Sequence, residues 1–181
     1  PLNQVKPYQS ADKDKKQEVE LMFDKISGKY DLLNKVLSLG IDRNWRKQAL
    51  SLLVSHKPQH LLDVATGTGD MAFMADKILH PGKITGIDLS MGMLEVAKRR
   101  LADSKVKYGA TIEFLKGDAE NLPFGDNSFD AATVTFGVRN FGDLHKGLSE
   151  MRRVLRPGAP IVVLEFTKPR IFPVRQLFDI Y

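Results

Sequence analysis

The feature that most limits the fold is a short apolar run at residues 61–65, which ends in the glycine-containing turn Thr66-Gly67-Thr68-Gly69-Asp70. A helical pattern follows the turn to about Leu79, and further short apolar runs alternate with helical segments along the chain. Parallel strands joined by crossover helices form sheets that are covered on both faces. The pattern therefore predicts an α/β, Rossmann-like, doubly wound and mostly parallel sheet, with its ligand crevice at the carboxyl ends of the strands.

The hydrophobic pattern also predicts where the individual elements lie. Strands are expected at residues 61–65, 83–87, 111–115, 129–135 and 160–166, and helices at 70–79, 91–101 and 144–155. Ser90 is expected to cap the helix that follows it. Before the first strand, apolar residues from Val19 onward recur every three or four positions, which predicts amphipathic helices, and another helix is expected at 45–54.

These elements suggest a single globular domain with a helical extension. A chain of 181 residues, 43% of them hydrophobic, can bury one sizeable core but is too short for two ordinary domains. We expect a mobile leader at residues 1–16, an N-terminal helical lid at 17–56 and a ligand-binding Rossmann-like core at 57–181.

Composition excludes several kinds of site. The chain has no Cys, so it cannot form a disulfide, a thiolate metal site or a Cys nucleophile, and its four His residues are too scattered to suggest a metal site. The net charge of +5 is spread along the chain, so nucleic-acid binding is not expected. Apolar runs are too short to span a bilayer, which predicts a cytoplasmic protein. A homodimer is compatible with the sequence.

The glycine turn and the acid after the second strand suggest a nucleotide-like cofactor. Gly67 and Gly69 allow the backbone to approach a ligand closely, and Asp88 lies about 20 residues later, where it can accept a hydrogen bond from a ribose hydroxyl. Gly67-x-Gly69-x-x-Ala72 also fits a loose dinucleotide fingerprint. A nicotinamide-dependent dehydrogenase therefore stays open as an alternative.

Three acids favour S-adenosylmethionine over a dinucleotide. Asp63 can orient the glycine loop and, directly or through water, a methionine ammonium group. Asp70 at the start of the next helix would repel a pyrophosphate. Asp118, in Gly117-Asp118-Ala119, can accept from an adenine amino group while the Ala119 N–H donates to a ring nitrogen. The candidate cofactor-binding residues are Asp63, Gly67, Thr68, Gly69, Asp88, Leu89, Met93, Asp118, Ala119 and Thr135.

The segment after the fourth strand points to the acceptor. Thr135-Phe136-Gly137-Val138-Arg139-Asn140-Phe141 lacks the Pro-Pro-aromatic pattern of enzymes that methylate exocyclic amines. The stretch from Val134 to Asn140 resembles the fingerprint of the menaquinone and ubiquinone biosynthesis C-methyltransferases, which are class I S-adenosylmethionine-dependent enzymes. Two further stretches are similar to that family: residues 22–34 with Trp45-Arg46, and Leu164-Glu165-Phe166-x-Lys168-Pro169.

The resemblance implies an enzyme of the demethylmenaquinone methyltransferase type, which methylates a ring carbon of a polyprenylated quinol, either demethylmenaquinol or a ubiquinol precursor. It implies that Arg139 favours the phenolate form of the quinol, while Asn140 and Tyr30 orient the ring. It also implies transient contact with the inner face of the membrane. Such enzymes continue past a position like Tyr181 into a helix and an antiparallel strand pair, so a C-terminally truncated chain is expected.

Other functions remain open on the sequence alone. A class I methyltransferase acting on another small molecule would share the same cofactor crevice. A non-catalytic module that binds S-adenosylmethionine or a quinone would share it as well. The sequence does not identify a general base.

Overall fold

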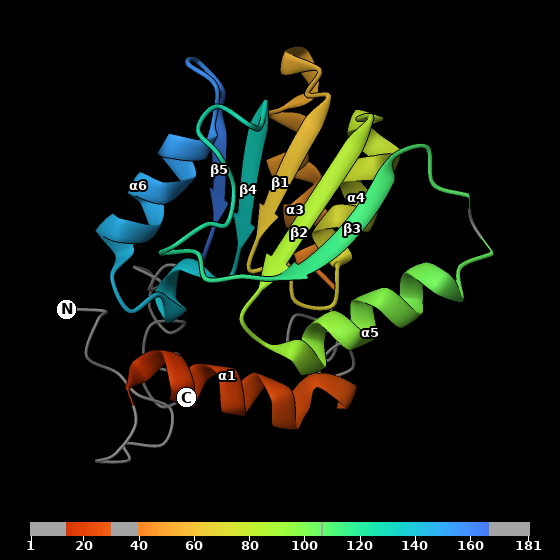
Figure 1. Ribbon diagram of the computed structural model, residues 1–181. Helices are drawn as coiled ribbons and strands as arrows, with labels where there is room; N and C mark the ends of the chain where they lie inside the picture. Colours follow the sequence, from red (N-terminus) through yellow and green to blue (C-terminus); the bar gives the residue numbers. More distant parts are fainter. Residues whose placement is uncertain (1–13, 30–39, 106, 167–181) are drawn as a thin grey trace, which may run out of the picture.

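The computed structural model describes residues 14–29, 40–105 and 107–166 (Figure 1). Its strands are β1 (His60–Val64), β2 (Lys83–Asp88), β3 (Thr111–Lys116), β4 (Ala131–Thr135) and β5 (Ile161–Leu164). They form one parallel sheet in the order β3-β2-β1-β4-β5. The order runs outward from β1 on one side and then reverses to β4, which places a topological switch point between β1 and β4. The predicted doubly wound parallel sheet is confirmed.

Helices precede the sheet and connect its strands. They are α1 (Lys15–Ile26), α3 (Asp42–Ser51), α4 (Asp70–Leu79), α5 (Met91–Ala102) and α6 (Leu144–Val154), with 3-10 helices η2 (Ser27–Lys29), η3 (Val54–His56) and η4 (Val138–Asn140). Ser90 caps α5 as predicted, because its side chain accepts from the Met93 N–H. α1 begins at Lys15, before the predicted start of the lid, because the Asp14 side chain caps it through the Gln17 N–H at 2.8 Å.

Side chains alternate between the two faces of the sheet, and each face has its own apolar cluster. Leu61, Ile84 and Ala131 contribute to a cluster with buried residues of α3, α4 and α5. Leu62 and Ala132 point to the other face, where a second cluster includes residues of α6 and of the segment between β3 and β4. Burial on both faces explains why the central strands β1 and β4 contain few charged residues, whereas the edge strand β3 is mostly exposed.

Two strands are shorter than their apolar runs. β4 begins at Ala131 and not at residue 129, because Phe129 joins only an isolated bridge to Leu155 and packs in the core. β5 covers Ile161–Leu164 within the predicted run of 160–166. Phe166 lies beyond the strand and is exposed.

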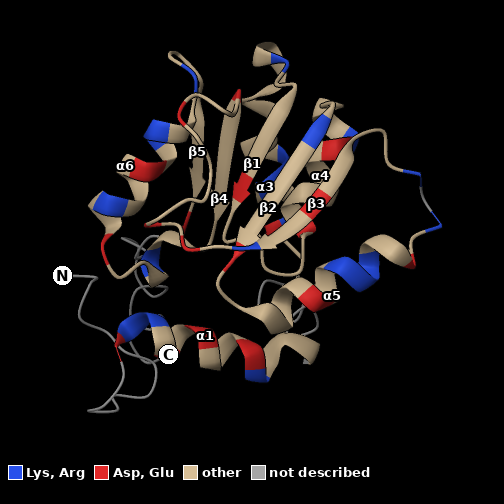
Figure 2. Ribbon diagram, in the orientation of Figure 1, with Lys and Arg blue, Asp and Glu red and all other residues tan. Residues whose placement is uncertain are grey.

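Helix α1 lies across the carboxyl ends of the strands, as Figure 1 shows. Several acidic residues also gather at this edge of the sheet (Figure 2). The edge is the one at which ligands bind in open α/β sheets. Within the described ranges, no helix is long and apolar enough to cross a membrane.

Candidate functional site

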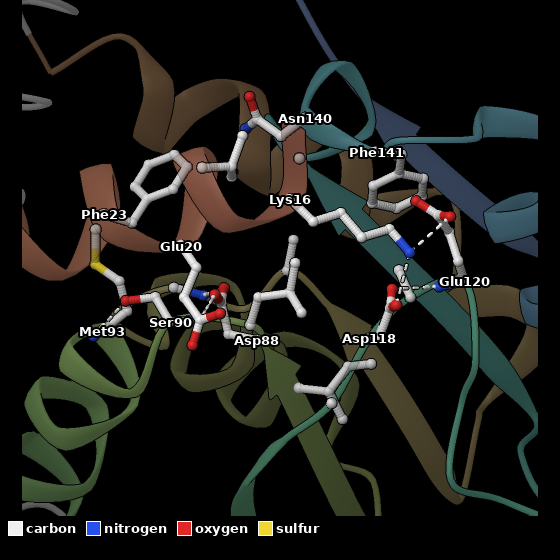
Figure 3. A pocket seen from close by; sticks show the side chains of 18 of the residues that line it. Lys16, Glu20, Phe23, Asp88, Ser90, Met93, Asp118, Glu120, Asn140 and Phe141 are labelled. Carbon is white, nitrogen blue, oxygen red and sulfur yellow. Dashed lines mark hydrogen bonds and ion pairs between the residues drawn. The ribbon is translucent and has the colours of Figure 1, made fainter. Parts of the chain in front are cut away.

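A cavity opens at the carboxyl ends of β1, β2, β3 and β4, beneath α1 (Figure 3). We call it the main cavity because it is the one at the strand ends where the predicted site residues meet. The space within it is about 710 Å³ when the solvent at its mouth is included. Eight predicted site residues line it: Gly67, Asp88, Leu89, Met93, Asp118, Ala119, Thr135 and Asn140. Segments that are far apart in the sequence therefore meet around one crevice.

Asp88 is held in place by the backbone of two turns. Its Oδ2 accepts from the Gly67 N–H at 2.8 Å and its Oδ1 from the Ser90 N–H at 2.9 Å. Burial raises the pKa of Asp88 above its ordinary value, although the backbone N–H groups oppose this shift. The carboxyl group therefore fixes the end of β2 against the glycine loop, at a position where Asp88 also lines the main cavity.

Asp118 is engaged by a side chain of α1. Lys16 Nζ lies 2.7 Å from Asp118 Oδ2 and 2.8 Å from Glu120 Oε2, as the dashed lines in Figure 3 indicate. Although partial burial opposes it, the two carboxylates raise the pKa of the Lys16 ammonium group. Lys16 thus binds an oxygen of Asp118 that was predicted to accept a hydrogen bond from an adenine amino group.

Further contacts fix α1 over the crevice. Lys15 Nζ donates to the Phe141 carbonyl at 2.7 Å, and Glu20 pairs with Lys116 at 2.6 Å. Near the other end of the helix, Asp24 Oδ1 accepts from the Ser90 hydroxyl at 2.5 Å and the Gly92 N–H at 2.9 Å. The helix therefore forms one wall of the main cavity.

Asp63 lies in β1 and is buried, with 1% of its surface exposed. One carboxyl oxygen accepts from the Thr66 hydroxyl at 2.6 Å and the other from the Thr133 hydroxyl at 2.7 Å. Burial raises its pKa to about 6, while the two hydroxyl groups and the nearby Arg46 oppose the shift. Two roles were predicted for Asp63: to orient the glycine loop or to contact a methionine ammonium group. These contacts fit the first role.

A side cavity of about 360 Å³, again including solvent at its mouth, adjoins the main cavity. The two share Ala65, Gly67, Thr135 and Phe136 as lining residues. The side cavity is also lined by Asp63 and Thr68, which the sequence analysis proposed for cofactor binding, and by Arg46 of α3.

Gly69 lines neither cavity. It caps α4 with a φ of 86°, and a Cβ atom there would lie 2.9 Å from ring atoms of both Phe73 and Phe114. Conformation and packing therefore account for this glycine. By contrast, Ala65 and Phe136 adopt φ values of 53° and 55° at the ends of β1 and β4, although neither is a glycine. Such strained residues concentrate at functional sites.

The three predicted catalytic residues are placed differently. Asn140 lines the main cavity from η4. Arg139 lies in the same 3-10 helix, but its side chain is 41% exposed, forms an ion pair with Glu165 and lies 5.5 Å from the centre of the Phe166 ring. Tyr30 lies outside the described residues.

Sequence reasoning missed several residues at the crevice. Lys16 and Glu20 of α1 are charged residues without a motif, and only the folded chain brings them to their partners, which are Asp118 and Glu120 for Lys16 and Lys116 for Glu20. Arg46 entered the sequence prediction only as part of a family resemblance, and its burial could not be predicted from the sequence. Within the described residues, no cluster of three His, Asp or Glu residues could hold a metal ion.

Comparisons with known proteins agree with this geometry. The chain is 49% identical over 181 residues to a demethylmenaquinone methyltransferase of Bacteroides fragilis, and it spans 73% of that protein. Over 169 residues, or 93% of the chain, it is 43% identical to the ubiquinone/menaquinone biosynthesis C-methyltransferase of Geotalea daltonii and covers 71% of it. A solved S-adenosylmethionine-dependent methyltransferase from Aquifex aeolicus superposes with a TM-score of 0.56 at 26% identity, over 63% of this chain and 60% of that one.

A family profile accounts for nearly the whole chain. The profile of the ubiE/COQ5 methyltransferase family matches residues 11–181, which include α1, every strand of the sheet and the segment around Arg139. This match agrees with the sequence resemblance and with the crevice at the switch point. The chain belongs to the ubiE/COQ5 methyltransferase family.

Proposed function

We propose that the protein transfers the methyl group of S-adenosylmethionine to a ring carbon of a polyprenylated quinol, with demethylmenaquinol as the first acceptor to test and a ubiquinol precursor as the second. The observation that carries the proposal is the crevice itself: acids at neighbouring strand ends line one cavity in a chain of this family. The names of the relatives supply the acceptor class.

The lining of the two cavities fits S-adenosylmethionine, which supplies an electrophilic methyl group when bound. Asp88 is placed to accept from ribose hydroxyls, and Asp118 to accept from the adenine amino group. Met93, which is 1% exposed, offers an apolar surface beside them. Gly67 and Thr135 line both cavities, so they stand where the nucleoside and the amino-acid part of the cofactor would join.

Arg139 is proposed to favour the phenolate form of the quinol. A ring carbon becomes nucleophilic when the neighbouring hydroxyl loses its proton, and a permanently charged guanidinium lowers the pKa of that hydroxyl. Arg139 lies in the turn that also brings Asn140 to the main cavity. Its present partner, Glu165, would have to share the guanidinium with the substrate oxygen. Asn140 and Tyr30 are proposed to orient the ring.

Aromatic side chains offer a surface for a quinol ring next to Arg139. The Phe136 and Phe166 rings stack with centroids 4.4 Å apart, and Trp45 meets Phe166 edge-on at 5.7 Å. Aromatic pairs of this kind add favourable packing for a further ring. Phe136 belongs both to this cluster and to the two cavities, so it connects the proposed acceptor site with the cofactor site.

The physical character of the acceptor leads to two further proposals about partners. A polyprenylated quinol resides in a membrane, so transient contact of the protein with a membrane surface is proposed. A homodimer and the absence of nucleic-acid binding stay predictions from the sequence.

A direct test is methyl transfer from labelled S-adenosylmethionine to demethylmenaquinol and to the demethylated ubiquinol precursor, with the product analysed for label on a ring carbon. We expect label on carbon with at least one acceptor. A protein that binds the cofactor but labels neither quinol would instead be a non-catalytic binding module or would use another acceptor. Tight binding of NAD in place of S-adenosylmethionine would revive the dehydrogenase alternative.

A further inference from the structure

Arg46 is a buried cation whose hydrogen-bonding capacity is only partly used. It lies in α3, outside the segments that carry the cofactor motifs, and only 6% of its surface is exposed. Its Nη1 donates to Asp42, and its Nη2 lies 3.9 Å from Asp70 Oδ2, beyond hydrogen-bond distance. Among the residues that the structure describes, the Arg46 Nε has no hydrogen-bond partner.

A second polar atom in the same place is also unsatisfied. The Thr135 Oγ1, at the end of β4, is buried and has no hydrogen-bond partner within the described residues. Thr135 and Arg46 both line the side cavity. Buried polar groups in proteins are nearly always hydrogen-bonded, so two unpartnered atoms on residues that line one cavity indicate a site for a polar ligand.

The charges around Arg46 show which ligand group the cavity would accept. Asp70 is already paired with Arg100 at 2.7 Å, and the oxygens of Asp63 accept from two threonine hydroxyls. Arg46 therefore has Asp42 as its hydrogen-bonded counter-charge, through Nη1, while neither Asp63 nor Asp70 accepts a hydrogen bond from it and its Nε is left without a partner among the described residues. A guanidinium group binds carboxylates strongly and directionally, which favours an incoming carboxylate.

The position of the side cavity identifies the source of that carboxylate. It meets the main cavity at Gly67 and Thr135, next to the acids assigned to the nucleoside. A ligand whose adenosine part lies against Asp88 and Asp118 would extend its amino-acid part past these shared residues. The α-carboxylate of the methionine moiety would then reach the side cavity.

We infer that Arg46, together with Thr135, binds the α-carboxylate of the cofactor. This inference rests on the proposed function, because it takes S-adenosylmethionine as the ligand of the crevice. The inference gives α3 a role in ligand binding. This helix places a cation, Arg46, at the ends of β1 and β4, and none of the motifs at the strand ends contains such a cation. Phe136, with the Arg46 guanidinium 5.5 Å from its ring centre, covers this cation on one side.

The test compares two ligands that differ only in the carboxylate: S-adenosylhomocysteine and its decarboxylated analogue, S-adenosyl-3-thiopropylamine. Dissociation constants are measured by calorimetry for the unmodified protein and for Arg46→Met, Arg46→Lys and Thr135→Val. Arg43→Met is the matched control, because Arg43 is an exposed arginine in the same helix and lines neither cavity.

We expect Arg46→Met to weaken S-adenosylhomocysteine about 30-fold but the decarboxylated analogue less than about threefold. Arg46→Lys should retain part of the preference for the carboxylate, Thr135→Val should lose about fivefold for S-adenosylhomocysteine only, and Arg43→Met should change neither ligand. Equal weakening of both ligands by Arg46→Met would mean that Arg46 only supports the fold, and it would overturn the inference.

The unmodified protein provides a test that does not depend on how a variant folds. It should bind S-adenosylhomocysteine at least about 30-fold more tightly than the decarboxylated analogue. Equal affinity would overturn the carboxylate site while leaving the cofactor assignment intact. Failure to bind either ligand would overturn the proposed function and the inference with it.

Discussion

The main cavity and the side cavity are built in different ways. In the main cavity, Asp88 and Asp118 are fixed by backbone N–H groups of adjacent turns, such as those of Ser90 and Glu120, each 2.9 Å away. In the side cavity, side chains fix both charged residues: Asp63 accepts from the hydroxyls of Thr66 in the adjacent turn and Thr133 of β4, and Arg46 pairs with Asp42 of its own helix. Asp63 and Arg46 are both almost completely buried. The first arrangement is local and open, while the second is closed in the sense that its charged groups are almost completely buried in the packed core.

The difference shows that the two parts of the proposed cofactor site depend on the fold to different extents. Acids at strand ends need only a short turn to hold them, so they can face a ligand directly. A buried cation needs counter-charges and hydrogen bonds from several elements, so its position depends on the whole packed core. Substitutions in the main cavity should therefore change ligand affinity, and substitutions in the side cavity should change both affinity and stability.

The largest effect is expected from a residue that lines neither cavity. Arg139→Ala should lower kcat for quinol methylation about 300-fold, because it removes the proposed stabilisation of the phenolate, while the Kd for S-adenosylhomocysteine stays within about twofold. Steady-state kinetics and calorimetry measure the two quantities separately. A large change in Kd with unchanged kcat would show that Arg139 belongs to cofactor binding.

Asp88→Ala tests the open, local arrangement of the main cavity. It should raise the Kd for S-adenosylhomocysteine about 100-fold, because both the ribose contacts and the hydrogen bond to Gly67 are lost. Asp103→Ala is a matched control, since Asp103 is exposed at the far end of α5. An affinity that changes no more than in this control would remove Asp88 from the site.

Asp63→Asn tests the closed arrangement through pH. Because burial raises the pKa of Asp63 from 3.8 to about 6, the folded protein keeps a proton that the unfolded chain releases between about pH 4 and 6. Asp63 therefore reduces stability as the pH rises through this window. The unfolding free energy of Asp63→Asn relative to the unmodified protein should increase by about 2.4 kcal/mol between pH 4 and 7.

Urea denaturation of both proteins at several pH values measures this difference. Because other titrating groups are common to the two proteins, their contributions largely cancel. A difference that stays constant between pH 4 and 7 would mean that Asp63 ionises normally, and the contrast between the two cavities would then fail.

The smallest effect is expected where α1 meets the main cavity. Lys16→Met should tighten S-adenosylhomocysteine about threefold, because the adenine amino group would no longer compete with the Lys16 ammonium for Asp118. Calorimetry can resolve a change of this size. Weaker binding would show that Lys16 holds α1 over the ligand and does not compete with it.

Much of the fold was predictable because its signals are local. The strands are apolar runs, Ser90 is a capping residue at a helix start, and Gly67 allows a positive φ of 57° in the turn after β1. The ends of β4 and β5 were less predictable, because apolar residues such as Phe129 pack in the core without joining the sheet. Periodicity records burial, and it does not distinguish a strand from a buried loop residue.

The site residues likewise fall into those predicted from local sequence signals and those whose positions depend on packing between distant elements. Asp88 and Asp118 were found because Asp88 ends β2 and Asp118 comes shortly after β3, and the fold brings such positions to one edge of the sheet. Lys16 and Arg46 were not identified as site residues, because their places depend on how α1 and α3 pack against the sheet. Arg139 was found by family resemblance, and its ion pair with Glu165 depends on the ends of β4 and β5 lying side by side.

The most direct test of the account is a crystal structure of the protein with S-adenosylhomocysteine bound. We predict adenine against Asp118, ribose hydroxyls on Asp88 and the amino-acid part in the side cavity beside Arg46, with the sulfur facing the η4 segment. A nucleoside bound away from the ends of β1, β2 and β4 would contradict the account.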